Sequence, residues 1–208
     1  MSVKIVSTGY VPRPLQKTMH LSLRRFNVIL CHRRFGKTIF SLNEMLDKGL
    51  RCTHKNPQYA YVAPTYGQAK RIAWDQLKEI VKNIPNVTVN EADLRIDIAR
   101  PHLSDRVRII LLGAENPGAI RGIYLDGVIF DEYAEMNPEV WTSVVRPALS
   151  DREGWGIFIG TPKGANHFYG VYTKAQGKED WFTAVYKASE TGILPQAELD
   201  AAREIMSP

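Results

Sequence analysis

Short apolar segments rich in β-branched and aromatic residues alternate along this chain with longer segments of helical periodicity. This alternation is typical of a mainly parallel β-sheet flanked by helices on both faces, an α/β fold. The expected strands cover residues 26–31, 59–63, 106–113, 125–131, 154–160 and 181–187. The expected helices cover residues 37–50, 66–83 and 138–149, the last with Asn137 as N-cap and Pro138 at its first position.

The segment between the second expected helix and the third expected strand has a different pattern. Its apolar residues Leu94, Ile96 and Ile98 alternate with polar ones, as in a strand with one buried face. Pro101 follows, and proline is confined to strand ends and sheet edges because it cannot donate a backbone hydrogen bond. The pattern therefore predicts a strand or hairpin at an edge of the sheet, ended by Pro101.

Chain length and composition favour one globular domain. The chain has 208 residues, of which 44% are hydrophobic, which is enough for one substantial core. It contains no apolar run of the roughly 18 to 20 residues that span a bilayer, and its N-terminus lacks the pattern of a secretory signal. We expect an intracellular domain without membrane association over residues 1–190. Residues 191–208 are expected to form a C-terminal helix or the start of a linker to a second domain.

Charge and cysteine content bear on partners and compartment. The formal net charge of +5 favours an anionic partner such as a polyphosphate or a nucleic acid, although many basic proteins bind neither. The two cysteines, Cys31 and Cys52, have neither metal-ligand spacing nor the pattern of a disulfide framework, as expected in a reducing compartment. We expect Cys31 to be a small buried residue rather than a reactive one.

The stretch VILCHRRFGKTIFSL leads an apolar strand into Gly36-Lys37-Thr38 and then into a helix. This order is typical of a phosphate-binding loop, in which backbone N–H groups at the helix N-terminus face the phosphates. Lys37 would then contact the β- and γ-phosphates, and the Thr38 hydroxyl would be a ligand of Mg²⁺. Because Gly-Lys-Thr also occurs by chance, the assignment depends on the preceding strand and on an acidic pair downstream.

The loop departs from the usual pattern where its first glycine would stand. Cys31 occupies that position, so the loop must turn with a side chain present. Arg33 and Arg34 follow, within a few residues of the expected γ-phosphate. They are either a solvated basic pair or guanidinium groups that stabilise the charge of phosphoryl transfer or sense the nucleotide state.

Two adjacent carboxylates end the apolar strand in GVIFDEYAEM. In an extended chain neighbouring side chains point to opposite sides, so Asp131 and Glu132 are expected to have different roles. Asp131, at the strand end, is the predicted Mg²⁺ ligand, directly or through water. Glu132 is the predicted base that orients and polarises the attacking water. The alternative is a solvated acidic pair, but Lys37 and Thr38 upstream favour catalysis.

Another apolar strand, in GIFIGTPKG, ends in Gly160-Thr161-Pro162. A small polar residue at the carboxyl end of a strand beside the nucleotide-binding strand can contact both the γ-phosphate and a metal-bound water. Loss of phosphate would then move this segment, which makes residues 160–162 the predicted coupling segment. An ordinary turn is the alternative, because Thr-Pro and Lys-Gly favour one.

These motifs occur in a recognisable order. CHRRFGKT, VIFDE and IGTP follow one another, PRPLQ precedes them at residues 12–16, and YVAPTYGQAKRIAWDQL lies between the first two. Together they resemble the ATPase domain of the large terminase subunit, the DNA-packaging motor of tailed double-stranded DNA phages, over about residues 12–187. The resemblance implies a P-loop NTPase fold of the ASCE, RecA-like type. An arginine-bearing phosphate loop without the first glycine is typical of that family, which accounts for Cys31.

The resemblance also implies roles for individual residues. Gln16 corresponds to an adenine-recognising glutamine, and Arg33 to an arginine that acts within its own subunit. Arg121, followed by Gly122 shortly before the acidic strand, corresponds to a finger offered to the neighbouring subunit's nucleotide; an exposed loop arginine is the alternative. The nucleotide would lie on Gln16, Arg33, Arg34, Phe35, Gly36, Lys37 and Thr38.

Partners follow from the same resemblance. ATP and Mg²⁺ would bind the domain, and a homo-oligomeric ring, a pentamer on the capsid, would move double-stranded DNA into a procapsid in the host cell cytoplasm. The portal protein and the small terminase subunit would be its protein partners. Large terminases continue into a ribonuclease-H-like nuclease domain that 208 residues do not accommodate, so we expect no DNA cleavage. Lys70, Arg71 and Lys163 are candidate DNA contacts from charge alone.

Two other functions share these motifs. A superfamily 1 or 2 helicase core has the glutamine, the phosphate loop and the Asp-Glu pair, but it needs a second RecA-like domain, and 208 residues hold only one. A nucleotide-binding switch or scaffold would bind without hydrolysis. Glu132 argues against a switch, because a binder needs no water-activating carboxylate.

Overall fold

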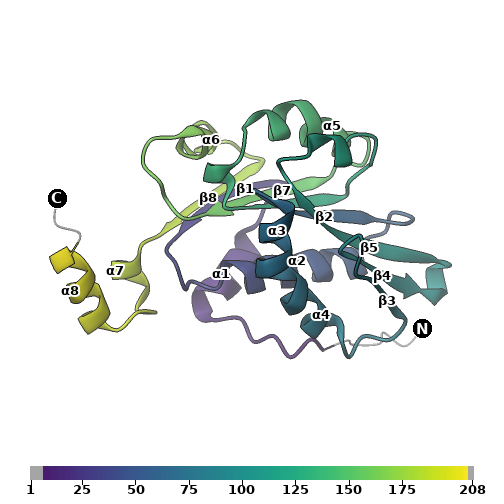
Figure 1. Ribbon diagram of the computed structural model, residues 1–208, viewed down its shortest axis with the longest axis horizontal. Coiled ribbons are helices and arrows are strands. Elements are labelled where there is room, and N and C mark those ends of the chain that lie inside the picture. Colours follow the sequence, from purple (N-terminus) through teal and green to yellow (C-terminus); the bar gives the residue numbers. More distant parts are fainter. Residues whose placement is uncertain (1–6, 206–208) are drawn as a thin grey trace.

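A computed structural model describes residues 7–205, and a mixed β-sheet of eight strands forms the centre of this part of the chain (Figure 1). The strand order is β3-β4-β5-β2-β6-β7-β1-β8. Neighbours from β5 to β8 pair in parallel, whereas β3 and β4 form an antiparallel hairpin that pairs with β5. The strands are β1 (Phe26–Cys31), β2 (Gln58–Ala63), β3 (Val87–Asn90), β4 (Arg95–Arg100), β5 (Asp105–Gly113), β6 (Gly127–Asp131), β7 (Trp155–Gly160) and β8 (Trp181–Tyr186).

Helices cover both faces of the sheet (Figure 1), so the expected α/β architecture is confirmed. On one face lie α1 (Pro14–Ser22), α2 (Lys37–Arg51), α3 (Tyr66–Ala69) and α4 (Asp75–Val81). On the other lie α5 (Arg146–Ala148) and α6 (His167–Ala175). After β8 come α7 (Ala188–Thr191) and α8 (Gln196–Ile205), and α8 extends away from the sheet at the yellow end of the chain.

The sheet separates two hydrophobic cores, because successive residues of a strand point to opposite faces. Ile129 of β6 packs in the core under α1, α2 and α4. Its neighbours Val128 and Phe130 pack in the other core, together with Phe168 of α6. A strand buried on both faces needs a continuous apolar sequence, which is why β6 reads as an uninterrupted run. None of the helices within residues 7–205 is long and apolar enough to cross a membrane.

Several elements differ in detail from the sequence expectations. The helix expected over 66–83 contains a π-helical turn at Lys70–Trp74 between α3 and α4. The helix expected over 138–149 likewise begins as a π-helical segment at Val140–Val145 before α5. Asn137 does cap it, since its side-chain oxygen accepts the backbone N–H of Glu139 at 2.9 Å. Hydrophobic periodicity does not distinguish these turns from α-helix.

The predicted edge hairpin is confirmed, with a boundary shifted by one residue. Leu94 is buried but adopts the left-handed conformation, with φ of 46°, so β4 begins only at Arg95. Pro101 follows the last strand residue and starts a short 3-10 turn. The C-terminal helix is confirmed as α8, and residues 206–208 lie outside the described part. The boundary between a domain at 1–190 and a linker after it stays a prediction.

Helices α1 and α6 were not expected, although both have sequence signals at their starts. Pro14 occupies the first turn of α1, and the Arg13 backbone N–H is bonded by the Gln16 side chain at 3.0 Å. Asn166 caps α6, where its side-chain oxygen accepts the backbone N–H groups of Phe168 and Tyr169. Both helices are only nine residues long, which makes their periodicity weak.

Candidate active site

The predicted motifs meet at one edge of the sheet. In the strand order β6-β7-β1, the acidic pair follows β6, the predicted coupling segment follows β7, and the phosphate loop follows β1. Because the carboxyl ends of parallel strands lie at the same edge, segments far apart in sequence become neighbours there. Position at the end of β7 next to β1, expected for Thr161, is confirmed.

Three side chains form a connected cluster at this edge. The Lys37 amino group donates to the Thr161 hydroxyl at 3.1 Å and lies 3.4 Å from a Glu132 carboxylate oxygen. Thr161 in turn donates to Glu132 twice, from its backbone N–H at 3.1 Å and from its hydroxyl at 3.2 Å. The side chains of Lys37 and Glu132 are only 11% and 25% exposed. Such partly desolvated, charge-assisted contacts are stronger than those between surface ions.

Glu132 does not continue the extended chain, which corrects the reason given for the different roles of the two carboxylates. It adopts the left-handed conformation, with φ of 55° and ψ of 45°, immediately after β6 ends at Asp131. This turn, rather than strand alternation, directs its carboxylate toward Lys37 and Thr161. Gly160 allows the close approach of the two segments, since a Cβ there would lie 3.3 Å from the Glu132 Cα.

Asp131 is buried beside this cluster, with 3% of its surface exposed. Its Oδ2 accepts a hydrogen bond from the Tyr61 hydroxyl, while its Oδ1 is buried and has no hydrogen-bond partner among residues 7–205. Burial raises the pKa of this carboxyl from 3.8 to about 6. An unpartnered buried carboxylate oxygen at the end of a strand fits a ligand of a divalent cation, which prefers oxygen donors. The donor set thus fits Mg²⁺, with Thr38 in the first turn of α2 as the second predicted ligand.

The phosphate loop turns later than a glycine at its first position would require. Cys31 is still the last residue of β1, is fully buried, and has its pKa raised to about 12 by that burial. The expectation of a small, buried, unreactive cysteine is therefore confirmed. The left-handed residues of the turn are Arg34, with φ of 65°, and Gly36, with φ of 89°. No conformation reserved for glycine is needed at position 31.

Helix α1 fastens the loop from outside. The Gln16 amide donates to the Gly36 carbonyl at 3.2 Å, and the Arg13 guanidinium donates to the carbonyls of Arg34 and Phe35 at 3.4 and 3.3 Å. The contact with Gln16 is close enough that a Cβ on Gly36 would lie 2.8 Å from the Gln16 amide nitrogen. Arg13 was not predicted as a site residue, because an arginine before a proline has no distinctive pattern.

A small, mostly apolar cavity of about 180 Å³ adjoins the loop. The C-terminal segment contributes to its wall, and the His32 ring nitrogen lies 2.8 Å from the Thr191 hydroxyl. Phe35 is fully buried and stacks on Tyr186 with ring centroids 4.9 Å apart. The cavity is lined by Arg13, Pro14, Leu15, Gln16, Phe35, Thr191 and Ile193.

The arginines predicted to act on the nucleotide are exposed. Arg33, Arg34 and Arg121 all lie on the surface, and their side chains form no hydrogen bond or ion pair with any residue from 7 to 205. Arg121 lies in the loop before β6, where its backbone N–H donates to Pro117. Of the candidate DNA contacts, Lys70 and Arg71 are exposed in the π-helical turn, and Lys163 forms an ion pair with Glu135.

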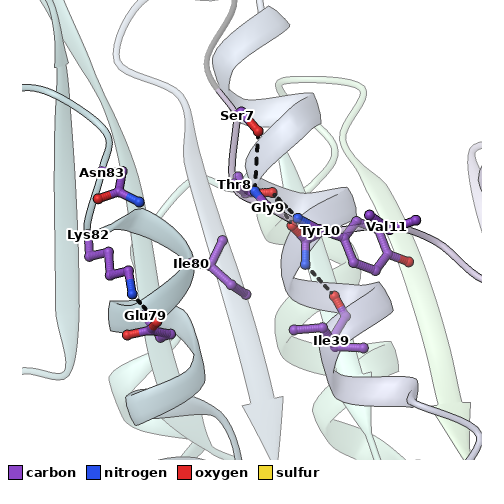
Figure 2. Close-up of a pocket in the computed structure, with 11 residues that line it drawn as sticks. Ser7, Thr8, Gly9, Tyr10, Val11, Ile39, Glu79, Ile80, Lys82 and Asn83 are labelled. Carbon is purple, nitrogen blue, oxygen red and sulfur yellow. Dashed lines mark hydrogen bonds and ion pairs between the residues drawn. The ribbon is translucent and has the colours of Figure 1, made fainter.

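Two other features lie apart from this edge. A cavity of about 700 Å³ lies between the segment 7–11 and helices α2 and α4, and Figure 2 shows Thr8, Ile39 and Ile80 around it. None of the predicted site residues lines it. At the opposite end of the strands, Cys52, His54 and Asp126 place potential ligand atoms within 4.8 Å of one another. The Asp126 carboxylate already accepts from His54 at 2.6 Å and from the Gln58 backbone at 2.9 Å, so this group is a hydrogen-bonded anchor of the loops.

Comparison with known proteins places the chain in a family. The model of a family described as terminase large subunit, T4likevirus-type, N-terminal, matches residues 28–201. The chain belongs to this family. The large terminase subunit of Thermus phage G20c is 30% identical over 176 residues, which are 77% of this chain and 36% of the relative. That of Escherichia phage T5 is 28% identical over 160 residues, 75% of this chain and 34% of the relative. This terminase domain thus spans about a third of the length of the curated relatives it matches.

Solved structures give the same result for the fold. The ATPase domain of the large terminase of Thermus phage P74-26 is 26% identical and superposes with a TM-score of 0.78, covering 97% of this chain and 90% of that one. The large terminase of another thermophilic bacteriophage, in complex with ADP, has a TM-score of 0.73 at 19% identity, covering 89% and 46% of the two chains. The predicted fold and the resemblance to a terminase ATPase domain are confirmed.

Proposed function

We propose that this terminase domain hydrolyses ATP and that, within a large terminase, the hydrolysis drives double-stranded DNA into a procapsid. The observation that carries the proposal is the cluster of Lys37, Thr161 and Glu132 at one edge of the sheet. It combines a cation for the phosphates, a carboxylate for the attacking water, and a hydroxyl between them. The structures of the large terminase from the thermophilic bacteriophage in complex with ADP and with ATP-γ-S support a nucleotide ligand for this edge.

The phosphate loop would bind the phosphates and its flank the base. Backbone N–H groups at the start of α2 face the loop, and the Lys37 charge would lie on the β- and γ-phosphates. The cavity beside Gln16 and Phe35 is apolar and adjoins the loop, which suits a purine ring. In the present conformation both polar ends of the Gln16 amide are bonded within the chain, so recognition of adenine by Gln16 requires it to exchange one of these bonds.

Thr38 and Asp131 would hold Mg²⁺. When bound, Mg²⁺ neutralises the charge that develops on the β- and γ-phosphate oxygens. The buried, unpartnered Oδ1 of Asp131 supports this role. Arg33, which is exposed on the loop, would add a guanidinium from the same subunit, while Arg34 holds the left-handed turn beside it.

Hydrolysis would depend on a change of partner by Lys37. In this structure Lys37 lies 3.4 Å from Glu132 and stabilises its carboxylate as an anion. When the γ-phosphate attracts Lys37, Glu132 loses a cationic neighbour and becomes a stronger base for the water. Thr161 remains bonded to Glu132, so a change at the γ-phosphate reaches residues 160–162 through this one side chain. These residues are therefore the proposed coupling segment.

The remaining partners are those of a packaging motor. A homo-oligomeric ring, a pentamer on the capsid, would place Arg121 of one subunit against the nucleotide of the next, and the portal protein and the small terminase subunit would bind this ring in the host cytoplasm. Exposure of Arg121 without any contact to its own site supports action on a neighbour. The helicase and switch alternatives predict different products from the same mixture of ATP and DNA.

The test is steady-state ATP hydrolysis with and without duplex DNA, for the wild type, Glu132→Gln and the control Glu135→Gln. Glu135 follows three residues later and pairs with Lys163 on the surface, so its loss should leave hydrolysis unchanged. We expect hydrolysis by the wild type and the control and its loss in Glu132→Gln. Separation of DNA strands would instead indicate a helicase, and tight binding of ATP without turnover would indicate a switch.

A further inference from the structure

Tyr61 is a buried polar residue that the proposed mechanism does not use. It lies in β2, the strand that pairs with β6 on the side away from the phosphate loop, and it stands opposite Ile129, two residues before Asp131. Its side chain is fully buried. A tyrosine in such an apolar strand is normally a core residue, but a buried phenol also needs hydrogen-bond partners.

Both partners of this phenol are predicted metal ligands. The Tyr61 hydroxyl donates to Oδ2 of Asp131. Burial and the Asp131 charge raise the pKa of Tyr61 well above its ordinary value of 10, while a side-chain hydrogen bond from Thr38 acts in the opposite direction. The phenol is thus a protonated donor to Asp131 and an acceptor from Thr38, and it connects α2, β2 and β6.

The directions of these two hydrogen bonds matter for the metal site. Because Oδ2 of Asp131 is occupied by Tyr61, the carboxylate presents its other oxygen, Oδ1, which is the one without a partner within the described residues. Because Thr38 gives its proton to Tyr61, its oxygen lone pairs stay free. One phenol therefore orients both ligands in the state that a hard cation requires.

We propose that Tyr61 is a positioning residue that preorganises Thr38 and Asp131 for Mg²⁺. The inference rests on the proposed function, because it takes the two residues as metal ligands. Partners that orient metal ligands are typically worth 10- to 100-fold in metal affinity. Loss of the Tyr61 hydroxyl should therefore weaken the metal-dependent part of nucleotide binding and leave the metal-independent part intact.

The test is a titration of Mg²⁺ against binding of fluorescent N-methylanthraniloyl-ADP, with a parallel measurement in EDTA, for the wild type, Tyr61→Phe and Tyr59→Phe. Tyr59 is a matched control: it lies two residues earlier on the same strand, is equally buried, and donates its hydroxyl only to the Lys48 carbonyl at 3.4 Å. For Tyr61→Phe we expect a rise of roughly tenfold or more in the Mg²⁺ concentration at half-effect. Binding in EDTA should stay within about twofold of the wild type, and Tyr59→Phe should match the wild type in both measurements.

Two results would overturn the assignment. An unchanged Mg²⁺ midpoint in Tyr61→Phe would show that the hydroxyl does not act on the metal site, and an equal loss of binding in EDTA and in Mg²⁺ would show a purely structural role. If Tyr61→Phe fails to fold, Tyr61→Met takes its place with the same measurements. Absence of any Mg²⁺ effect on the wild type would instead refute the proposed function, so the two failures are distinguishable.

Discussion

Thr161 holds the Glu132 carboxylate through two hydrogen bonds, from its backbone N–H at 3.1 Å and from its hydroxyl at 3.2 Å. The backbone bond ties the position of the coupling segment directly to the predicted base. Thr161 also accepts a hydrogen bond from Lys37, so phosphate binding and water activation share one intermediate residue. A turn that only connected β7 to α6 would need none of these contacts.

Replacement of Glu132 by glutamine should separate binding from hydrolysis. The amide oxygen of glutamine can still accept from Thr161, so the local fold should persist while the base is lost. We expect nucleotide affinity within a few-fold of the wild type and turnover lower by about 10²- to 10⁴-fold, the usual value of a general base. Equilibrium binding and single-turnover hydrolysis measure the two effects separately. Loss of binding together with turnover would make Glu132 a structural residue or a metal ligand.

Lys37→Ala should act earlier, on nucleotide binding itself. It removes the charge expected on the β- and γ-phosphates, and a hydrogen bond to a charged group is worth about 1.5 to 3 kcal/mol, or roughly 10- to 100-fold in affinity. Lys48→Ala is the matched control, because Lys48 lies on the same helix and pairs with Glu44 instead. Isothermal titration with ATP is the measurement. A Lys37→Ala variant that binds and turns over ATP as the wild type does would refute the phosphate-loop assignment.

The sequence predicted the sheet and the motifs because both depend on local patterns. Uninterrupted apolar runs identify strands buried on both faces, and Gly-Lys-Thr after a strand identifies the loop. Tyr61 could not be found in this way, since a tyrosine in an apolar strand has the same pattern whether or not its hydroxyl reaches Asp131 from the neighbouring strand. The left-handed turn at Glu132 also has no sequence signal, because it is maintained by contacts with Gly160 and Thr161 from another segment.

Asp131 should give the stability of the metal-free protein a recognisable pH dependence. Burial raises its pKa from 3.8 to about 6, so between these values the folded state binds more protons than the unfolded state. Stability contributed by this group therefore falls as the pH rises, and a shift of about two units costs about 3 kcal/mol above pH 6. Asp131→Asn removes the ionisation but keeps an oxygen acceptor for Tyr61.

We accordingly expect Asp131→Asn to be more stable than the wild type by up to about 3 kcal/mol at pH 7.5 and by about half as much at pH 5. Urea unfolding in EDTA at both pH values measures the difference. Comparison of the same pair of proteins at two pH values cancels the pH-independent effect of the amide on packing. A stability difference that stays constant or shrinks as the pH rises would contradict the raised pKa.

Arg121 provides the sharpest test of how subunits cooperate. Its side chain is exposed and contacts no other residue within 7–205, so Arg121→Ala should leave the ATP affinity of the isolated domain nearly unchanged. In an assembled ring of large terminase, turnover should fall by roughly 10³- to 10⁵-fold, the value of an arginine finger in related phosphoryl transfer. Arg106→Ala is a suitable control, since that exposed arginine lies on β5 and only approaches Asp97 at 3.8 Å. Isolated and assembled proteins must be assayed separately.

Mixed rings then decide which active site Arg121 serves. A subunit with Arg121→Ala retains Glu132, and a subunit with Glu132→Gln retains Arg121, so each is inactive in a uniform ring. Where the two alternate in the correct order, one interface regains both groups, and some hydrolysis should return at intermediate mixing ratios. If rings shown to contain both variants recover nothing at any ratio, Arg121 acts within its own subunit or only shapes the loop before β6. Recovery would require the arginine of one subunit to reach the nucleotide of the next.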